Sequence, residues 1–112
     1  MSCVFCEILK GNLNCSKLYE DEYVLAFKDV EPKAPVHFLV IPKEHISSVE
    51  AILPENMDII SKIFNVINEL AKSLNLCNGF RIVNNCGKDG GQTVPHMHFH
   101  ILGGRSMAWP PG

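Results

Sequence analysis

Apolar residues between positions 55 and 74 recur at the three- and four-residue spacing of an amphipathic helix. The stripe consists of Ile60, Ile63, Phe64, Ile67, Leu70, Ala71 and Leu74. The pair Asn78-Gly79, which follows shortly afterwards, is typical of a helix stop. We therefore expect a helix from about Glu55 to Leu74 that covers one face of a sheet.

A second, shorter helical pattern lies close to the N-terminus, over Cys3–Lys10. Its apolar positions share one stripe, and Gly11 follows at the place where a helix commonly ends. They are Val4, Phe5, Ile8 and Leu9. The pattern predicts a short helix that can form a lid on a pocket.

The remaining apolar segments are short and favour strands, because they are rich in β-branched and aromatic residues and are bounded by turn residues. They are 17–20, 23–29, 36–42, 80–84 and 96–102. With the two helices they predict one α+β domain over residues 1–112. Its core is a five-stranded antiparallel sheet with one long helix and a short N-terminal helix.

Three histidines alternate with apolar residues in the last of these segments. Successive strand side chains point to opposite faces, so His96, His98 and His100 share one face. The other face receives Met97, Phe99 and Ile101. Imidazoles two residues apart on a strand are spaced by about 6.6 Å, which suits a phosphate-sized group.

Three interpretations of this histidine row are open. The rings can be core side chains that are satisfied by backbone partners, or they can form a three-histidine catalytic zinc site with an open position for water. In the third interpretation one neutral imidazole attacks phosphorus while its neighbours stabilise the oxyanion. We favour the third, because three histidines at this period behind Gly90-Gly91 are typical of a polyanion site.

Composition and charge limit the classes of binding partner that we expect. The chain has 112 residues, of which 46% are hydrophobic and 20% charged, and its formal net charge is −2. No broad basic surface for nucleic acid is expected, and no segment approaches the roughly 20 apolar residues of a membrane span. The N-terminus lacks the pattern of a signal peptide, so we expect a cytoplasmic protein that binds neither nucleic acid nor membrane.

The five cysteines form an odd set without the dense spacing of a disulfide framework, which favours reduced thiols or metal ligands. Cys3 and Cys6 have the two-residue spacing with which two thiolates bind one zinc ion. A closed site needs two more ligands, which this spacing alone does not identify.

Several segments together resemble the histidine triad (HIT) family. His96–Leu102 fits the signature His-x-His-x-His followed by two apolar residues, Gly91–Val94 is similar to the phosphate loop, and Ala34–Lys43 is similar to the central strand. The tail Gly103–Gly112 resembles the Hint branch, the nucleoside phosphoramidases. Pro95 departs from that branch, which often has an aromatic residue there, and this departure bears on substrate selection.

The resemblance implies a purine nucleoside phosphoramidase that acts on adenosine 5′-phosphoramidate or an AMP-lysine conjugate. His98 would attack the α-phosphorus and become nucleotidylated, and His100 and His37 would stabilise the phosphate. His96 completes the catalytic triad, and Thr93 would contact the phosphate or the leaving group. Further contacts to the nucleotide are expected from Asn85, Gly91, Gln92 and Val94.

For the nucleoside, the resemblance implies an apolar site around the base and a carboxylate, Asp29, that accepts from the ribose hydroxyls. The residues around the base are Phe5, Ile8, Phe27, Val30 and Leu39. The expected ligand is a purine nucleoside monophosphate or its phosphoramidate.

The same resemblance implies that the chemistry needs no cofactor, that two chains form a homodimer, and that a structural zinc is bound. Its ligands would be Cys3, Cys6, His45 and His96. Two other functions remain open: hydrolysis of dinucleoside polyphosphates, and nucleotide binding without turnover in a sensor or scaffold.

Overall fold

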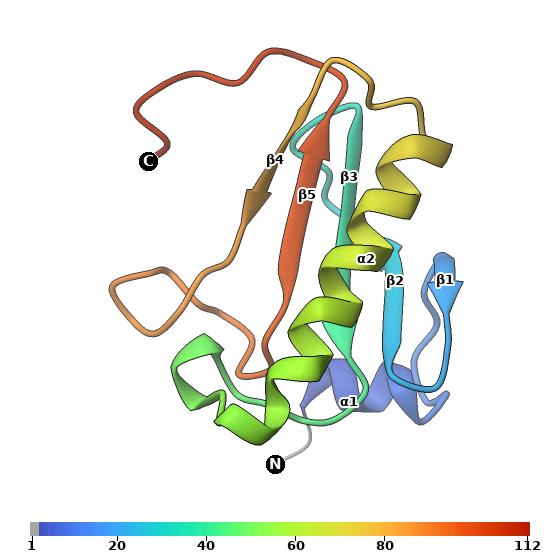
Figure 1. Cartoon of the computed structure of the whole chain (residues 1–112), viewed down its shortest axis with the longest axis vertical. Helices are drawn as coiled ribbons and strands as arrows, with labels where there is room; N and C mark the ends of the chain where they lie inside the picture. Colours follow the sequence, from blue (N-terminus) through green and yellow to red (C-terminus); the bar gives the residue numbers. More distant parts are fainter. Residues whose placement is uncertain (1–2) are drawn as a thin grey trace.

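The computed structural model describes residues 3–112, and its two α-helices and five strands occur in the predicted order (Figure 1). They are α1 (Val4–Leu9), β1 (Lys17–Glu20), β2 (Val24–Lys28), β3 (Val36–Pro42), α2 (Met57–Ser73), β4 (Phe80–Val83) and β5 (Phe99–Gly103). Two 3₁₀ turns that the sequence did not predict, η1 (Val49–Ala51) and η2 (Pro54–Asn56), precede α2.

The five strands form one antiparallel sheet in the order β1-β2-β3-β5-β4, which confirms the expected α+β architecture. β5 is inserted between β3 and β4, so it is hydrogen-bonded on both sides. Leu39 lies opposite His100, and His37 lies opposite Leu102. This register brings His37 and His100 to the same face of two neighbouring strands.

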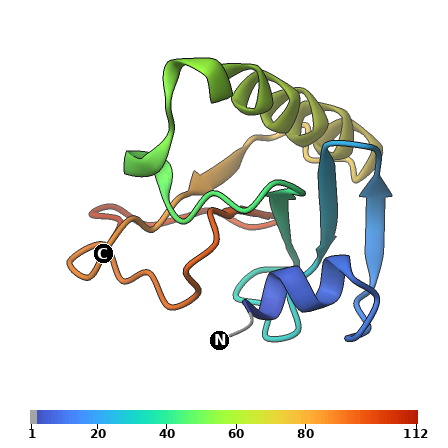
Figure 2. The same cartoon turned by 90° about the horizontal axis from the view of Figure 1, so that it is seen from below.

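Alternation along the strands divides the core between the two faces of the sheet. Phe38 and Val40 of β3 join the large apolar cluster under α2, whereas Leu39 and Ile41 join a smaller cluster that includes Phe5 of α1. Figure 2 shows α2 covering one face of the sheet and α1 lying toward the other. The histidine-bearing face is therefore the α1 face.

The long helix begins later than expected. Pro54–Asn56 form a 3₁₀ turn, and α2 runs from Met57 to Ser73 rather than from Glu55 to Leu74. The Asn56 side chain accepts a hydrogen bond from the backbone N–H of Leu53 at 3.2 Å, which stabilises this tighter entry. No helix among residues 3–112 is long and apolar enough to cross a membrane.

The last strand also begins later, at Phe99 instead of His96. Its partner β3 ends at Pro42, and the N–H of Met97 donates to the carbonyl of Ile46 in the loop that follows, at 2.6 Å. The side chains nevertheless keep their alternation, because Met97 joins Phe99 in the cluster under α2. The predicted division of the two faces is confirmed, although the first two histidines precede the strand.

Candidate active site

His98 lies at the entry to β5 with its ring held from one side. Its side chain is 5% exposed, and its Nδ1 lies 2.8 Å from the carbonyl oxygen of His96. A carbonyl can only accept, so Nδ1 carries the proton and the neutral ring presents an unshared electron pair at Nε2. Asn84 donates to the His98 carbonyl at 2.9 Å and fixes the backbone. Nε2 is thus the atom at which the His98 ring presents its unshared electron pair.

His100 presents a proton at Nε2, where His98 presents an electron pair. A chain of hydrogen bonds fixes this tautomer of His100. The backbone N–H of Lys33 donates to Nδ1 of His37 at 3.0 Å, so neutral His37 carries its proton on Nε2. That Nε2–H donates to Nδ1 of His100 at 3.0 Å, which leaves the His100 proton on Nε2. The rings of His98 and His100 are 5.1 Å apart. An electron pair and a hydrogen-bond donor therefore lie side by side.

Burial keeps this pair of histidines neutral. It lowers the pKa of His37, while the nearby Asp29 carboxylate opposes the change. Burial, followed by the positive charges that His98 and His37 would carry, lowers the pKa of His100 to about 4. Asp29 Oδ2 lies 3.4 Å from His37 Nε2 and 3.9 Å from His100 Nδ1. Near neutral pH the hydrogen bonds from Lys33 to His37 and from His37 to His100 therefore keep these directions.

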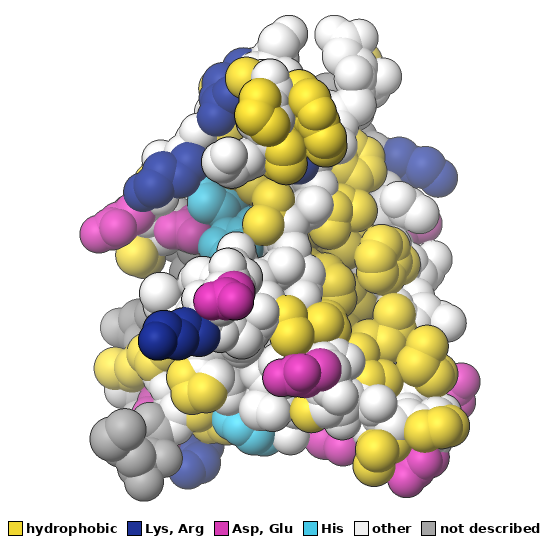
Figure 3. Space-filling model, turned by 90° about the vertical axis from the view of Figure 1, so that its left-hand side faces the viewer, with side chains coloured by type: hydrophobic (Ala, Val, Ile, Leu, Met, Phe, Trp, Pro, Cys, Tyr) yellow, Lys and Arg dark blue, Asp and Glu magenta, His cyan; other side chains and the backbone are white. Residues whose placement is uncertain are grey.

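An open cavity of about 410 Å³ adjoins this pair and has space for a phosphate group. Its lining combines apolar and polar side chains: Asp29, Glu31, Lys33, His37, Val83, Asn85, Thr93, His100 and Leu102. In Figure 3 histidine side chains reach this surface between charged and hydrophobic neighbours. Of the residues expected at the phosphate, the structure brings His37, His100, Thr93 and Asn85 together here.

The residues expected around a base form an apolar group beside His98. Phe5, Phe27 and Leu39 are buried in the smaller cluster, with Ile8 and Val94 packed against it. Val30 does not join them, because its side chain is 93% exposed. Asp29 lies with the histidine pair, and its Oδ1 accepts from the backbone N–H of Glu31 at 2.8 Å.

The loop before the triad is built largely by its own amide side chains. Gln92 donates to the carbonyls of Ser47 and Val94 and accepts from the N–H of Gly87, and Asn85 donates to Gly90. Gly91 has a φ of 76°, which a side chain would strain. Sequence reasoning missed the supporting roles of Asn84, Ile46 and the Lys33 backbone, because only tertiary structure reveals backbone partners.

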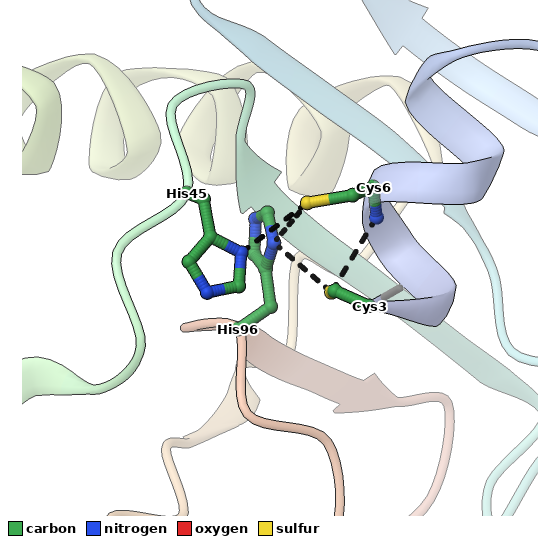
Figure 4. A group of neighbouring side chains, drawn as sticks. All are labelled: Cys3, Cys6, His45 and His96. Carbon is green, nitrogen blue, oxygen red and sulfur yellow. Dashed lines mark hydrogen bonds between the residues drawn. The ribbon is translucent and has the colours of Figure 1, made fainter. Parts of the chain in front are cut away.

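A second group of histidines lies with the two N-terminal cysteines (Figure 4). Cys3 Sγ and Cys6 Sγ lie 3.4 and 3.6 Å from Nδ1 of His96, and Cys6 Sγ lies 3.2 Å from Nδ1 of His45. All four donor atoms are within 4.8 Å of one another. Around tetrahedral zinc, sulfur and nitrogen ligands are about 3.5 Å apart. The four side chains therefore have the spacing of a closed zinc site.

The tautomer of His96 also suits a metal. Nε2 of His96 donates to the carbonyl of Pro42 at 2.9 Å, so its Nδ1 presents an electron pair to the sulfurs. Burial raises the pKa of the Cys6 thiol, and the neighbouring Cys3 raises it further. A bound cation would offset this effect and hold the cysteines as thiolates.

Asp29, His37 and His100 form a second group of metal-type donors, but it does not suit a metal. The Lys33 N–H occupies Nδ1 of His37, so coordination through Nε2 would require removal of the remaining ring proton. Within residues 3–112, neither group of possible ligands contains all three triad histidines. The geometry thus gives no support to a three-histidine catalytic zinc site.

Comparison with known proteins places this chain in a family. The HIT domain model matches residues 10–107. An uncharacterized HIT-like protein of Synechococcus elongatus is 43% identical over 109 residues, which are 97% of this chain and 96% of that protein. The chain belongs to the HIT domain family.

Solved structures of the family have the same fold. The structure of a HIT family hydrolase from Legionella pneumophila is similar with a TM-score of 0.97, at 40% identity, over 99% of this chain and 100% of that one. A histidine triad nucleotide-binding protein from Candida albicans has a TM-score of 0.84 at 34% identity, over 97% of this chain and 83% of that one. The fold is therefore shared by proteins described as a hydrolase and as nucleotide-binding.

Proposed function

We propose that this protein hydrolyses the P–N bond of purine nucleoside phosphoramidates, with His98 as the nucleophile. The observation that carries the proposal is the opposite polarity of two neighbouring rings: Nε2 of His98 offers an electron pair, and Nε2 of His100 offers a proton. One ring is suited to attack phosphorus, and the other to stabilise a non-bridging oxygen as charge develops.

The reaction would proceed in two displacements. Nε2 of His98 forms a bond to the α-phosphorus, the P–N bond to the amine breaks, and the amine nitrogen takes up one proton from solvent as it leaves. The oxygen of a water molecule then bonds to phosphorus and the bond between His98 and phosphorus breaks. The nucleoside monophosphate is released, one proton returns to solvent, and the His98 ring is again neutral. His37 and His100 remain neutral donors throughout, in keeping with the lowered pKa of each.

Thr93 lines two cavities, and this arrangement favours one direction of departure for the leaving group. One contains His37 and His100; the other, of about 460 Å³, is lined by Gly87, Lys88, Gly91, Gln92, Thr93 and Pro95. The amine would depart into the second cavity, where the Thr93 hydroxyl can help to deliver its proton. The base would lie against Phe5 and the neighbouring apolar residues, with Asp29 at the ribose.

The Cys3-Cys6-His45-His96 cluster would hold a structural zinc ion, which supplies a cross-link between segments distant in sequence. Cys3 and Cys6 belong to the N-terminal segment of α1, His45 follows β3, and His96 precedes β5. The reaction itself would need no cofactor, because His98 supplies the nucleophile and the Nε2–H of His100 supplies a hydrogen bond to the phosphate oxygen.

A homodimer would cover the sheet edge. β4 is the last strand in the sheet order and is paired on one side only. Ile82 on β4 is 37% exposed, Phe64 on α2 is 39% exposed, and hydrophobic side chains gather along this side in Figure 3. A second copy that pairs at β4 and packs against α2 would bury the unpaired edge of β4 and these exposed hydrophobic side chains.

The test is AMP release from adenosine 5′-phosphoramidate and from an AMP-lysine conjugate, with His98→Ala as the inactive variant. Cys77→Ala is the matched control, because Cys77 is exposed and lies outside both histidine groups. We expect turnover by the wild type and by Cys77→Ala only.

Two results would overturn the proposal. AMP binding without turnover by the wild type would identify a nucleotide-binding sensor or scaffold. Turnover of dinucleoside polyphosphates together with inertness toward both phosphoramidates would identify a polyphosphate hydrolase.

A further inference from the structure

Phe5 connects the cysteine–histidine cluster to the nucleophile. It lies between Cys3 and Cys6 in the sequence, is 7% exposed, and its ring packs edge-to-face on His98 with centroids 5.1 Å apart. The same ring contacts His96 at 5.8 Å and Phe27 at 5.7 Å. One side chain of α1 thus touches a cluster member, the nucleophile and the apolar group beside it.

The other restraint on the His98 ring also originates in the cluster. Nδ1 of His98 donates to the backbone carbonyl of His96, whose own ring faces Cys3 and Cys6. The next residue, Met97, donates its N–H to Ile46, which directly follows His45. Both the backbone that accepts from His98 and the ring that packs on it are therefore attached to the four cluster residues.

We propose that Phe5 is a positioning residue through which the Cys3-Cys6-His45-His96 cluster holds the His98 ring in its reactive orientation. When a metal occupies the cluster, α1 is fixed and the Phe5 ring restricts rotation of His98 about its side-chain bonds. Without the metal, α1 is held only by packing and by the weak hydrogen bonds of Cys3 and Cys6 to the two histidines, and a helix of six residues is not stable by itself. The His98 ring then exchanges its partner at Nδ1 for water.

This inference rests on the proposed role of His98, yet its main test does not depend on catalysis. The Nδ1 proton of a buried, hydrogen-bonded imidazole exchanges slowly with water, and NMR of histidine labelled with ¹⁵N measures the rate. The signal is assigned by its loss in His98→Gln. The rate is compared in zinc-loaded and chelated wild type, in zinc-loaded Phe5→Leu, and in zinc-loaded Leu9→Ala.

Leu9→Ala is the matched control, because Leu9 lies on α1 and packs against the same apolar cluster. Chelation and Phe5→Leu are each expected to speed exchange by about tenfold or more, and zinc added back should restore the chelated protein. Leu9→Ala is expected to stay within about twofold of the wild type. Equal protection in loaded and chelated wild type would overturn the proposal, as would a protein that takes up no zinc.

A second comparison separates positioning from substrate contact. A ring that serves only as a wall of the base site would, when replaced by leucine, weaken AMP binding and leave Nδ1 exchange unchanged; that pattern overturns the proposal. The positioning role predicts a lower rate of nucleotidylation at saturating substrate together with faster exchange. If the wild type forms no nucleotidyl adduct, the phosphoramidase proposal fails, while the exchange rates still decide the dependence on the cluster.

Discussion

The two histidine groups differ in the direction in which their rings present protons. In the cluster, the Pro42 carbonyl accepts from Nε2 of His96, which leaves an electron pair directed at the cysteines. In the pocket, the Lys33 N–H donates to Nδ1 of His37, so His37 donates from Nε2 to Nδ1 of His100. His100 therefore presents its own proton at Nε2. A backbone carbonyl leaves His96 with an electron pair at Nδ1, and a backbone amide leaves His37 with a donor at Nε2. The tautomers of His37 and His96 are therefore decided by their backbone partners, and that of His100 by His37.

Loss of the proposed nucleophile should have the largest effect, and that effect should be confined to the pocket. His98→Gln keeps a side-chain donor for the His96 carbonyl but removes the electron pair that, in the proposed reaction, attacks phosphorus. We expect AMP release to fall by about a thousandfold or more, with zinc content unchanged. Metal analysis and steady-state kinetics on the same preparation check both parts; residual turnover above about a tenth of wild type would contradict the assignment.

Loss of a proposed zinc ligand should have the next largest effect, and it should act by lowering the stability of the fold. Cys6→Ser removes a donor that lies within 3.6 Å of both cluster histidines. In zinc-containing buffer the free energy of unfolding is expected to fall by about 3 kcal/mol, because binding to the folded state no longer contributes.

Cys77→Ser provides the reference for that measurement, since Cys77 is exposed and free. Its unfolding free energy should stay within about 0.5 kcal/mol of the wild type. Urea unfolding with and without chelator makes the comparison. Cys6→Ser and Cys77→Ser proteins of equal stability would show that the cluster holds no stabilising ion.

The smallest expected effect is on the pH dependence of stability, and it arises from His100 in the pocket. The pKa of His100 is lowered to about 4, mainly by burial, whereas imidazole in an unfolded chain has a pKa of about 6.5. The unfolded state therefore binds this proton more readily, so His100 reduces stability as the pH falls from 6.5 toward 4 and has no such effect above 6.5. His100→Gln should lose less stability than the wild type between pH 7 and pH 5.

Urea unfolding of both proteins at the two pH values tests this difference. Release of zinc by acid is common to both and cancels in the comparison. Equal losses would show that His100 is not held neutral in the folded protein.

Local pattern predicted most of the architecture. Alternation located β1 and β3 with correct ends, and it assigned Met97, Phe99 and Ile101 to the face opposite the histidines. The start of β5 was wrong because the β3 partner ends at Pro42 and Met97 instead pairs with Ile46. Such partners depend on how distant segments meet, which residue periodicity does not encode.

The candidate site was predicted less completely. Spacing indicated a zinc-binding pair at Cys3 and Cys6, whereas His45 and His96 came only from the family resemblance. The structure brings these four together but leaves Val30 exposed and uses Gln92 to build the loop. The proton positions on His37 and His100 follow from the Lys33 backbone, which residue type does not reveal.

The most direct measurement is mass spectrometry of the wild type after mixing with adenosine 5′-phosphoramidate and quenching in base, where a phosphohistidine bond survives. We expect one AMP group on the peptide that contains His98, formed and lost at the rate of turnover and absent in His98→Gln. Turnover without an adduct, or an adduct on another residue, would contradict this expectation.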